Sequence, residues 1–63
     1  MKDPNRIFAI CIKIAAWWSD FPELRFMQLM SNFATWYGAD PFYLEDDEFI
    51  KKFEEYMKSL KGE

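Results

Sequence analysis

The side chains in this sequence that could carry out chemistry are few. The 63-residue chain has no histidine and one cysteine, Cys11. The usual ligands of a zinc or iron–sulfur site and the nucleophile–base pairs of hydrolases are therefore missing. No neighbouring cation is placed to activate the Cys11 thiol, so we expect it in the core as a small apolar residue. The sequence predicts a protein that is not an enzyme and that holds no metal and no cofactor.

The acidic run Glu45 to Glu48 has a catalytic and a structural interpretation. A calcium loop needs a glycine and a closing glutamate at spacings that this run does not have. Paired carboxylates support acid–base catalysis when a cleft shifts their pKa values. Acids are also stabilised at the positive N-terminal end of a helix, and this explains all four residues. We therefore interpret the run as a helix start.

Four large aromatic residues could stack on the bases of single-stranded nucleic acid: Trp17, Trp18, Trp36 and Tyr37. Few basic residues lie near them, and the formal net charge of the chain is −3, which disfavours binding to a polyanion. We expect most of these rings to pack in the core. Because Trp17 and Trp18 are adjacent, one of them should reach beyond the core to an interface.

Arg25 falls in the first turn of a predicted helix, where a positive charge is slightly unfavourable. A salt bridge to Glu23, to Asp20 or to the acidic run would offset this cost. Alternatively, Arg25 binds a partner protein. The sequence leaves both the salt bridge and the binding role open. The candidate partner-binding residues are Arg25, Trp36, Tyr37, Asp46 and Asp47.

Prolines and glycines divide the chain into three segments, and each has apolar residues at helical spacing. The first segment opens at Asp3-Pro4, a helix cap followed by a first-turn proline, and ends near Ser19. The second spans 23–37 and stops at Gly38. The third starts in the acidic run, and residues 42–44 before it should be extended. The sequence predicts one all-α domain over residues 1–63, a compact three-helix fold with the first helix at its centre.

The first segment is apolar over most of its circumference. Beside its main stripe, a second row of apolar residues falls on a different face. Two other helices cannot surround it, so the surplus apolar surface predicts a homodimer through this helix. The predicted dimer interface consists of Phe8, Ile12, Ala15 and Trp18.

The same apolar run is not expected to enter a membrane. It is shorter than the ~20 residues of a membrane span, and Lys13 interrupts it. No cleavage site of a signal peptide follows it. With the unpaired cysteine, these observations predict a cytoplasmic protein without a membrane partner.

Two stretches carry a resemblance: Pro22-Glu23-Leu24-Arg25-Phe26-Met27-Gln28-Leu29, and Asp40-Pro41-Phe42-Tyr43-Leu44-Glu45-Asp46-Asp47-Glu48. They make the chain similar, over nearly its whole length, to a group of small uncharacterised proteins from bacteria, prophages and phages. The resemblance brings no catalytic residues, but it implies a protein that docks on a bacterial host protein, such as an anti-phage defence component, and inhibits it. The alternatives are a nucleic-acid-associated regulator and a bacterial housekeeping protein with a structural role in a complex.

Overall fold

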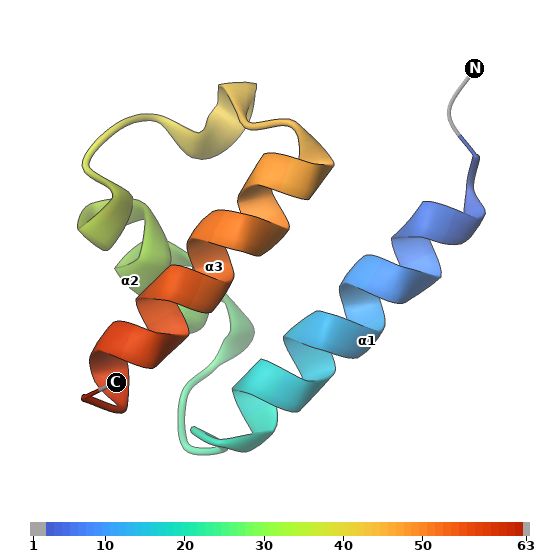
Figure 1. Cartoon of the computed structure of the whole chain (residues 1–63). Helices are drawn as coiled ribbons and strands as arrows, with labels where there is room; N and C mark the ends of the chain where they lie inside the picture. Colours follow the sequence, from blue (N-terminus) through green and yellow to red (C-terminus); the bar gives the residue numbers. More distant parts are fainter. Residues whose placement is uncertain (1–2, 63) are drawn as a thin grey trace.

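The computed structural model describes residues 3–62. They form three α-helices, α1 (Asn5–Ser19), α2 (Phe26–Tyr37) and α3 (Asp46–Leu60), and one turn of 3₁₀ helix, η1 (Pro41–Tyr43). No strand is present among these residues. Figure 1 shows α1 and α3 side by side, with α2 on the other side of α3. The predicted all-α three-helix fold is confirmed.

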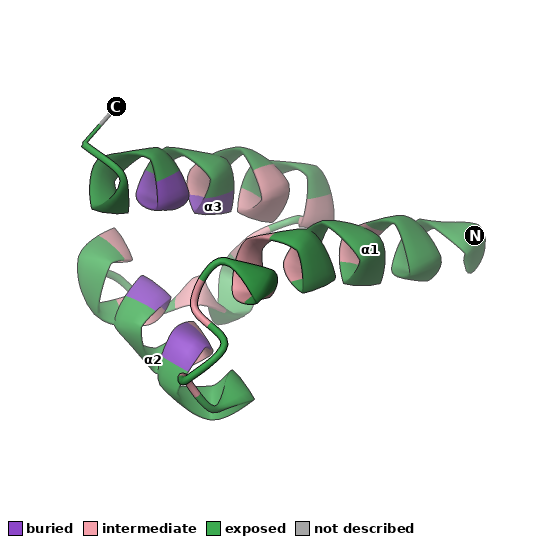
Figure 2. Cartoon of the chain, turned by 90° about the horizontal axis from the view of Figure 1, so that it is seen from below, coloured by how far each residue is buried: buried purple, intermediate pink, exposed green. Residues whose placement is uncertain are grey.

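The central helix is α3, and the prediction that the first helix lies at the centre is wrong. α3 packs against both α1 and α2. No residue of α1 is buried, and Figure 2 shows α1 mostly exposed along its length. The reason is geometric: the other helices cover one side of α1, so its remaining apolar residues have nothing in the chain to pack against.

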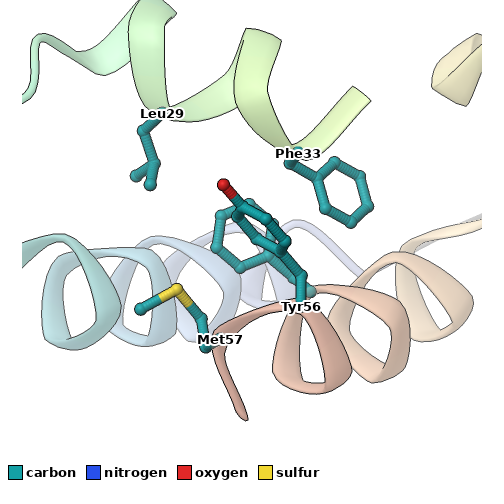
Figure 3. Packing of buried hydrophobic residues seen from close by; sticks show 5 residues of the cluster. Leu29, Phe33, Tyr56 and Met57 are labelled. Carbon is teal, nitrogen blue, oxygen red and sulfur yellow. The ribbon is translucent and has the colours of Figure 1, made fainter. Parts of the chain in front are cut away.

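The core forms where α2 faces α3. Its buried residues make one cluster, which Figure 3 shows in close-up. They are Leu29 and Phe33 of α2, and Phe53, Tyr56 and Met57 of α3. Half-buried aromatic residues extend this cluster toward α1, among them Trp17 and Trp18. The predicted apolar stripes of the second and third helices supply all five buried positions.

The ends of the helices follow the local chemistry of the sequence. The Asp3 carboxylate accepts a hydrogen bond from the Asn5 amide at 2.9 Å, which caps the start of α1. Gly38 ends α2 in the left-handed conformation, and its amide donates to the Ala34 carbonyl oxygen. α3 begins at Asp46 within the acidic run, as predicted.

Two local predictions need correction. The second helix starts three residues later than expected, at Phe26, where the Gln28 side chain accepts a hydrogen bond from the Arg25 amide. Phe42 and Tyr43 are not extended, because Pro41–Tyr43 form η1, and of the predicted extended residues 42–44 Leu44 alone has extended backbone angles. The Asp40 carboxylate accepts from the Phe42 amide at 3.0 Å, and the fixed φ of Pro41 suits this turn.

Ion pairs connect α1 to α3 at both ends. Arg6 Nε lies 2.7 Å from Asp46 Oδ2 near the start of both helices. Lys61 Nζ lies 2.7 Å from Asp20 Oδ2 just after both helices end. The two helices therefore run in the same direction, which brings the start of α3 beside the first half of α1.

Candidate functional site

The five predicted partner-binding residues do not share one surface. Arg25 precedes α2, whereas Trp36 and Tyr37 lie in its last turn, about 16 Å further along the helix axis. Tyr37 is half-buried and stacks on Phe33, with ring centroids 6.0 Å apart. Arg25 is therefore separated from Trp36 and Tyr37 by the length of α2, whereas Trp18 lies near it, since its indole nitrogen donates a hydrogen bond to the neighbouring residue Leu24.

Arg25 is exposed, and the structure gives its side chain no salt bridge within residues 3–62. Two of the acids predicted to pair with it have other partners, since Asp20 pairs with Lys61 and Asp46 pairs with Arg6. The predicted bridge to the acidic run is therefore not formed by Asp46.

Asp46 and Asp47 contribute to a shallow groove between the start of α3 and the first half of α1. The groove has a volume of about 360 Å³. It is lined by the apolar residues Ala9, Ile10 and Ile50 and by the charged residues Arg6, Glu45, Asp46 and Asp47. The sequence does not reveal this groove, because it depends on the pairing of α1 with α3.

An exposed pair of aromatic side chains comes shortly before the groove residue Glu45 in the sequence. Phe42 and Tyr43 of η1 are 80% and 81% exposed, and their rings meet edge to face at 5.0 Å. η1 holds them in place, since the Leu44 amide closes the turn on the Pro41 carbonyl oxygen at 3.0 Å. Sequence reasoning missed this pair. The signal that could have revealed it is the presence of two consecutive aromatic residues after Asp40-Pro41, outside the helical spacing of the apolar residues.

The predicted dimer interface lies on the outward face of α1. Phe8 is 66% exposed, Ile12 is 69% exposed and Ala15 is exposed. Trp18 is half-buried, and its indole nitrogen donates to the Leu24 carbonyl oxygen at 2.7 Å. Three of the four residues thus point away from the core, and Trp18 borders it.

Cys11 is exposed on this side of α1, so its prediction as a core residue is wrong. The residues of α1 that face the rest of the chain are Ile10, Ile14, Trp17 and Trp18, all half-buried. Cys11 follows Ile10 by one residue, which turns it about 100° round the helix and out of this contact.

The groove and the aromatic pair are suited to binding, and comparisons with known proteins assign no family. Within residues 3–62, no three histidine, cysteine, aspartate or glutamate side chains gather closely enough to hold a metal ion. Among the same residues, no helix has the length and apolar character needed to cross a membrane. No family of proteins, no curated protein and no solved structure matches the chain.

Proposed function

We propose that this protein is a non-enzymatic binding module that docks on another protein through the docking edge, defined as Phe42, Tyr43 and the groove at the start of α3. The observation that carries the proposal is the exposure of Phe42 and Tyr43 on a turn whose backbone is already ordered. Large rings presented without a further loss of backbone entropy are typical anchors of protein interfaces.

The charges at the docking edge indicate the chemistry of the partner surface. Asp40, Glu45 and Asp47 lie close in sequence to the rings, and the chain as a whole has a formal net charge of −3. A partner that presents an apolar pocket bordered by lysine or arginine residues complements this surface. The apolar residues that line the groove, in turn, accommodate an aliphatic side chain from the partner.

The resemblance to small bacterial, prophage and phage proteins supports a bacterial host protein as the target. Phe42 and Tyr43 fall within the longer of the two motifs that carry the resemblance. We propose an anti-phage defence component as the first target to test, with inhibition as the consequence of docking.

Co-purification of the tagged chain from bacterial lysate, with a high-salt wash, tests the proposal. We expect one dominant host protein, whose affinity falls at least ~10-fold for Phe42→Glu and for Tyr43→Ser, since central aromatic anchors contribute this much or more. Met27→Glu is the matched control, because Met27 is 66% exposed on α2, away from the docking edge. Retention of the same host protein by both docking-edge variants would contradict the proposal.

A further inference from the structure

The outward face of α1 carries an apolar seam that the rest of the chain leaves uncovered. We define the seam as the apolar residues Phe8, Ile12 and Ala15 together with Ser19, whose hydroxyl donates to the Ala15 carbonyl oxygen at 2.6 Å. They recur at steps of four, three and four residues, the spacing by which one helix packs along another. All four are exposed. A continuous apolar face of this kind, in contrast to scattered exposed residues, marks a binding surface.

We propose that a second copy of this chain occupies the seam, with the two α1 helices antiparallel about a twofold axis near Ile12. Phe8 projects at one end of the seam, and a shallow hollow of about 300 Å³ lies at the other end. The hollow is lined by Ala15, Trp18, Ser19 and Pro22. Because Ile12 lies between Phe8 and the hollow, a twofold axis there places Phe8 of each copy against the hollow of the other.

The distribution of charge favours a second copy as the occupant. Two chains of net charge −3 repel each other, and this repulsion is smaller when the surfaces that meet carry no negative charge. α1 has no acidic residue, and the seam contains no charged side chain. Arg6 is turned toward Asp46 of α3, and Lys13 lies more than a quarter-turn round the helix from Ile12. Two copies can therefore approach through the seam without bringing acidic side chains against each other.

The length of α1 sets the expected strength of the dimer. A helix of 15 residues is about 22 Å long, so two such helices bury less than the ~1,600 Å² of a standard interface. We therefore expect a reversible dimer that dissociates on dilution. This inference does not depend on the proposed function, because the seam and the docking edge are different surfaces.

Sedimentation velocity of the full chain over a dilution series tests the dimer. We expect twice the 7.7 kDa mass of one chain at high concentration, and the mass of a single chain at every concentration for Phe8→Glu and for Ile12→Glu. Phe42→Glu is the matched control, since it makes the same replacement at an exposed phenylalanine off the seam and should leave the dimer intact. Far-ultraviolet circular dichroism should show equal helix content in all variants.

Two results would overturn the dimer. One is a wild-type chain that stays monomeric at every concentration, which would mean that a different protein, and not a second copy, occupies the seam. The other is a dimer that tolerates both seam variants, which would place the contact on a different face. Neither result affects the docking-edge experiment, so the two proposals fail separately.

Cys11 reports the relative orientation of the two helices. It flanks the seam one residue before Ile12 and is exposed. In an antiparallel pair about Ile12 the two thiols face each other, whereas in a parallel pair each thiol faces the opposite flank of the other helix. Diamide, which takes up the two electrons and two protons released by the thiols, should therefore give a covalent dimer that a reducing agent reverses.

The crosslink should be lost in Cys11→Ser and strongly reduced in Phe8→Glu. A wild-type protein that sediments as a dimer yet gives no covalent dimer with diamide would overturn the antiparallel arrangement.

Discussion

At the scale of single residues, the fold is organised around Phe53. This side chain is fully buried, and its ring lies within 6 Å of four other rings. Those rings come from all three helices: Trp17 of α1, Phe33 of α2, and Phe49 and Tyr56 of α3. Aromatic pairs in such geometries each add about 0.5–1.5 kcal/mol beyond the burial of area. One residue of α3 thus connects the three helices.

Tyr56 makes the stability of the fold decrease at alkaline pH. Burial among these apolar rings raises the pKa of its phenol above the ordinary value of about 10, because the charged phenolate is poorly solvated there. As pH rises past about 10, the unfolded chain therefore releases this proton before the folded chain does. The stabilisation is fully present below that pH and is lost as pH rises through the folded-state pKa.

We expect the free energy of unfolding to fall more steeply between about pH 9 and pH 11 in the wild type than in Tyr56→Phe. Urea unfolding followed by circular dichroism at a series of pH values measures both slopes. Equal slopes would show that Tyr56 is ionised as readily in the folded chain as in the unfolded chain.

At the scale of elements, the ends of the helices are set locally. Gly38 stops α2 at φ +81°, a conformation that costs side-chain-bearing residues energy because of contacts with their own backbone. A Cβ atom added at this position would meet no atom within 4 Å. The cost of a substitution there is therefore a backbone cost alone.

Gly38→Ala should lower the free energy of unfolding by about 1 kcal/mol, the cost of the left-handed conformation for an alanine. Gly62→Ala is the matched control: its φ is +77° and its surroundings are equally open. Because Gly62 lies outside α3 and no helix follows it within residues 3–62, its backbone can relax without displacing a packed element, and we expect little effect. Urea denaturation of both variants measures the difference, and equal losses would refute the backbone explanation.

At the scale of the whole molecule, α1 is attached less firmly than the other helices. It contributes half-buried residues to the core, and its two ion pairs with the α3 region are partly exposed. Exposed ion pairs contribute about 0–1 kcal/mol each and weaken with salt. The stacking of Trp17 on Phe53, at 4.9 Å, is a direct contact between α1 and the buried core.

Amide hydrogen exchange should separate α1 from the α2–α3 pair. At a protein concentration low enough to exclude self-association, we expect the amides of Ile10 and Ile14 to be less protected than those of Phe53 and Tyr56, because few buried contacts oppose opening of α1. Trp17→Ala should lower the protection of α1 further. Equal protection in α1 and α3 would instead indicate that the three helices unfold as one unit.

The sequence alone determined the three helices and most of their ends, although α2 begins at Phe26 and not at residue 23. Three- and four-residue spacing predicted three helices, Asp3 and Gly38 predicted a start and an end, and the stripes of the second and third helices contain every buried residue. These features depend on neighbours along the chain, so local chemistry suffices to predict them. Local reasoning was wrong for Phe42 and Tyr43, where the Asp40 cap and Pro41 start a turn of 3₁₀ helix.

The arrangement of the helices was decided by tertiary structure. The first helix is apolar over most of its circumference, and a central position was predicted for it on that ground. The helix with the clearest separation of apolar and polar faces, α3, instead lies between the other two. The groove at Asp46 and Asp47, the exposure of Cys11 and the docking edge all follow from that arrangement. Which side of α1 is covered depends on contacts with residues some 40 positions away, as between Arg6 and Asp46. Spacing along the chain shows which residues share a face, but it does not show which face the rest of the protein covers.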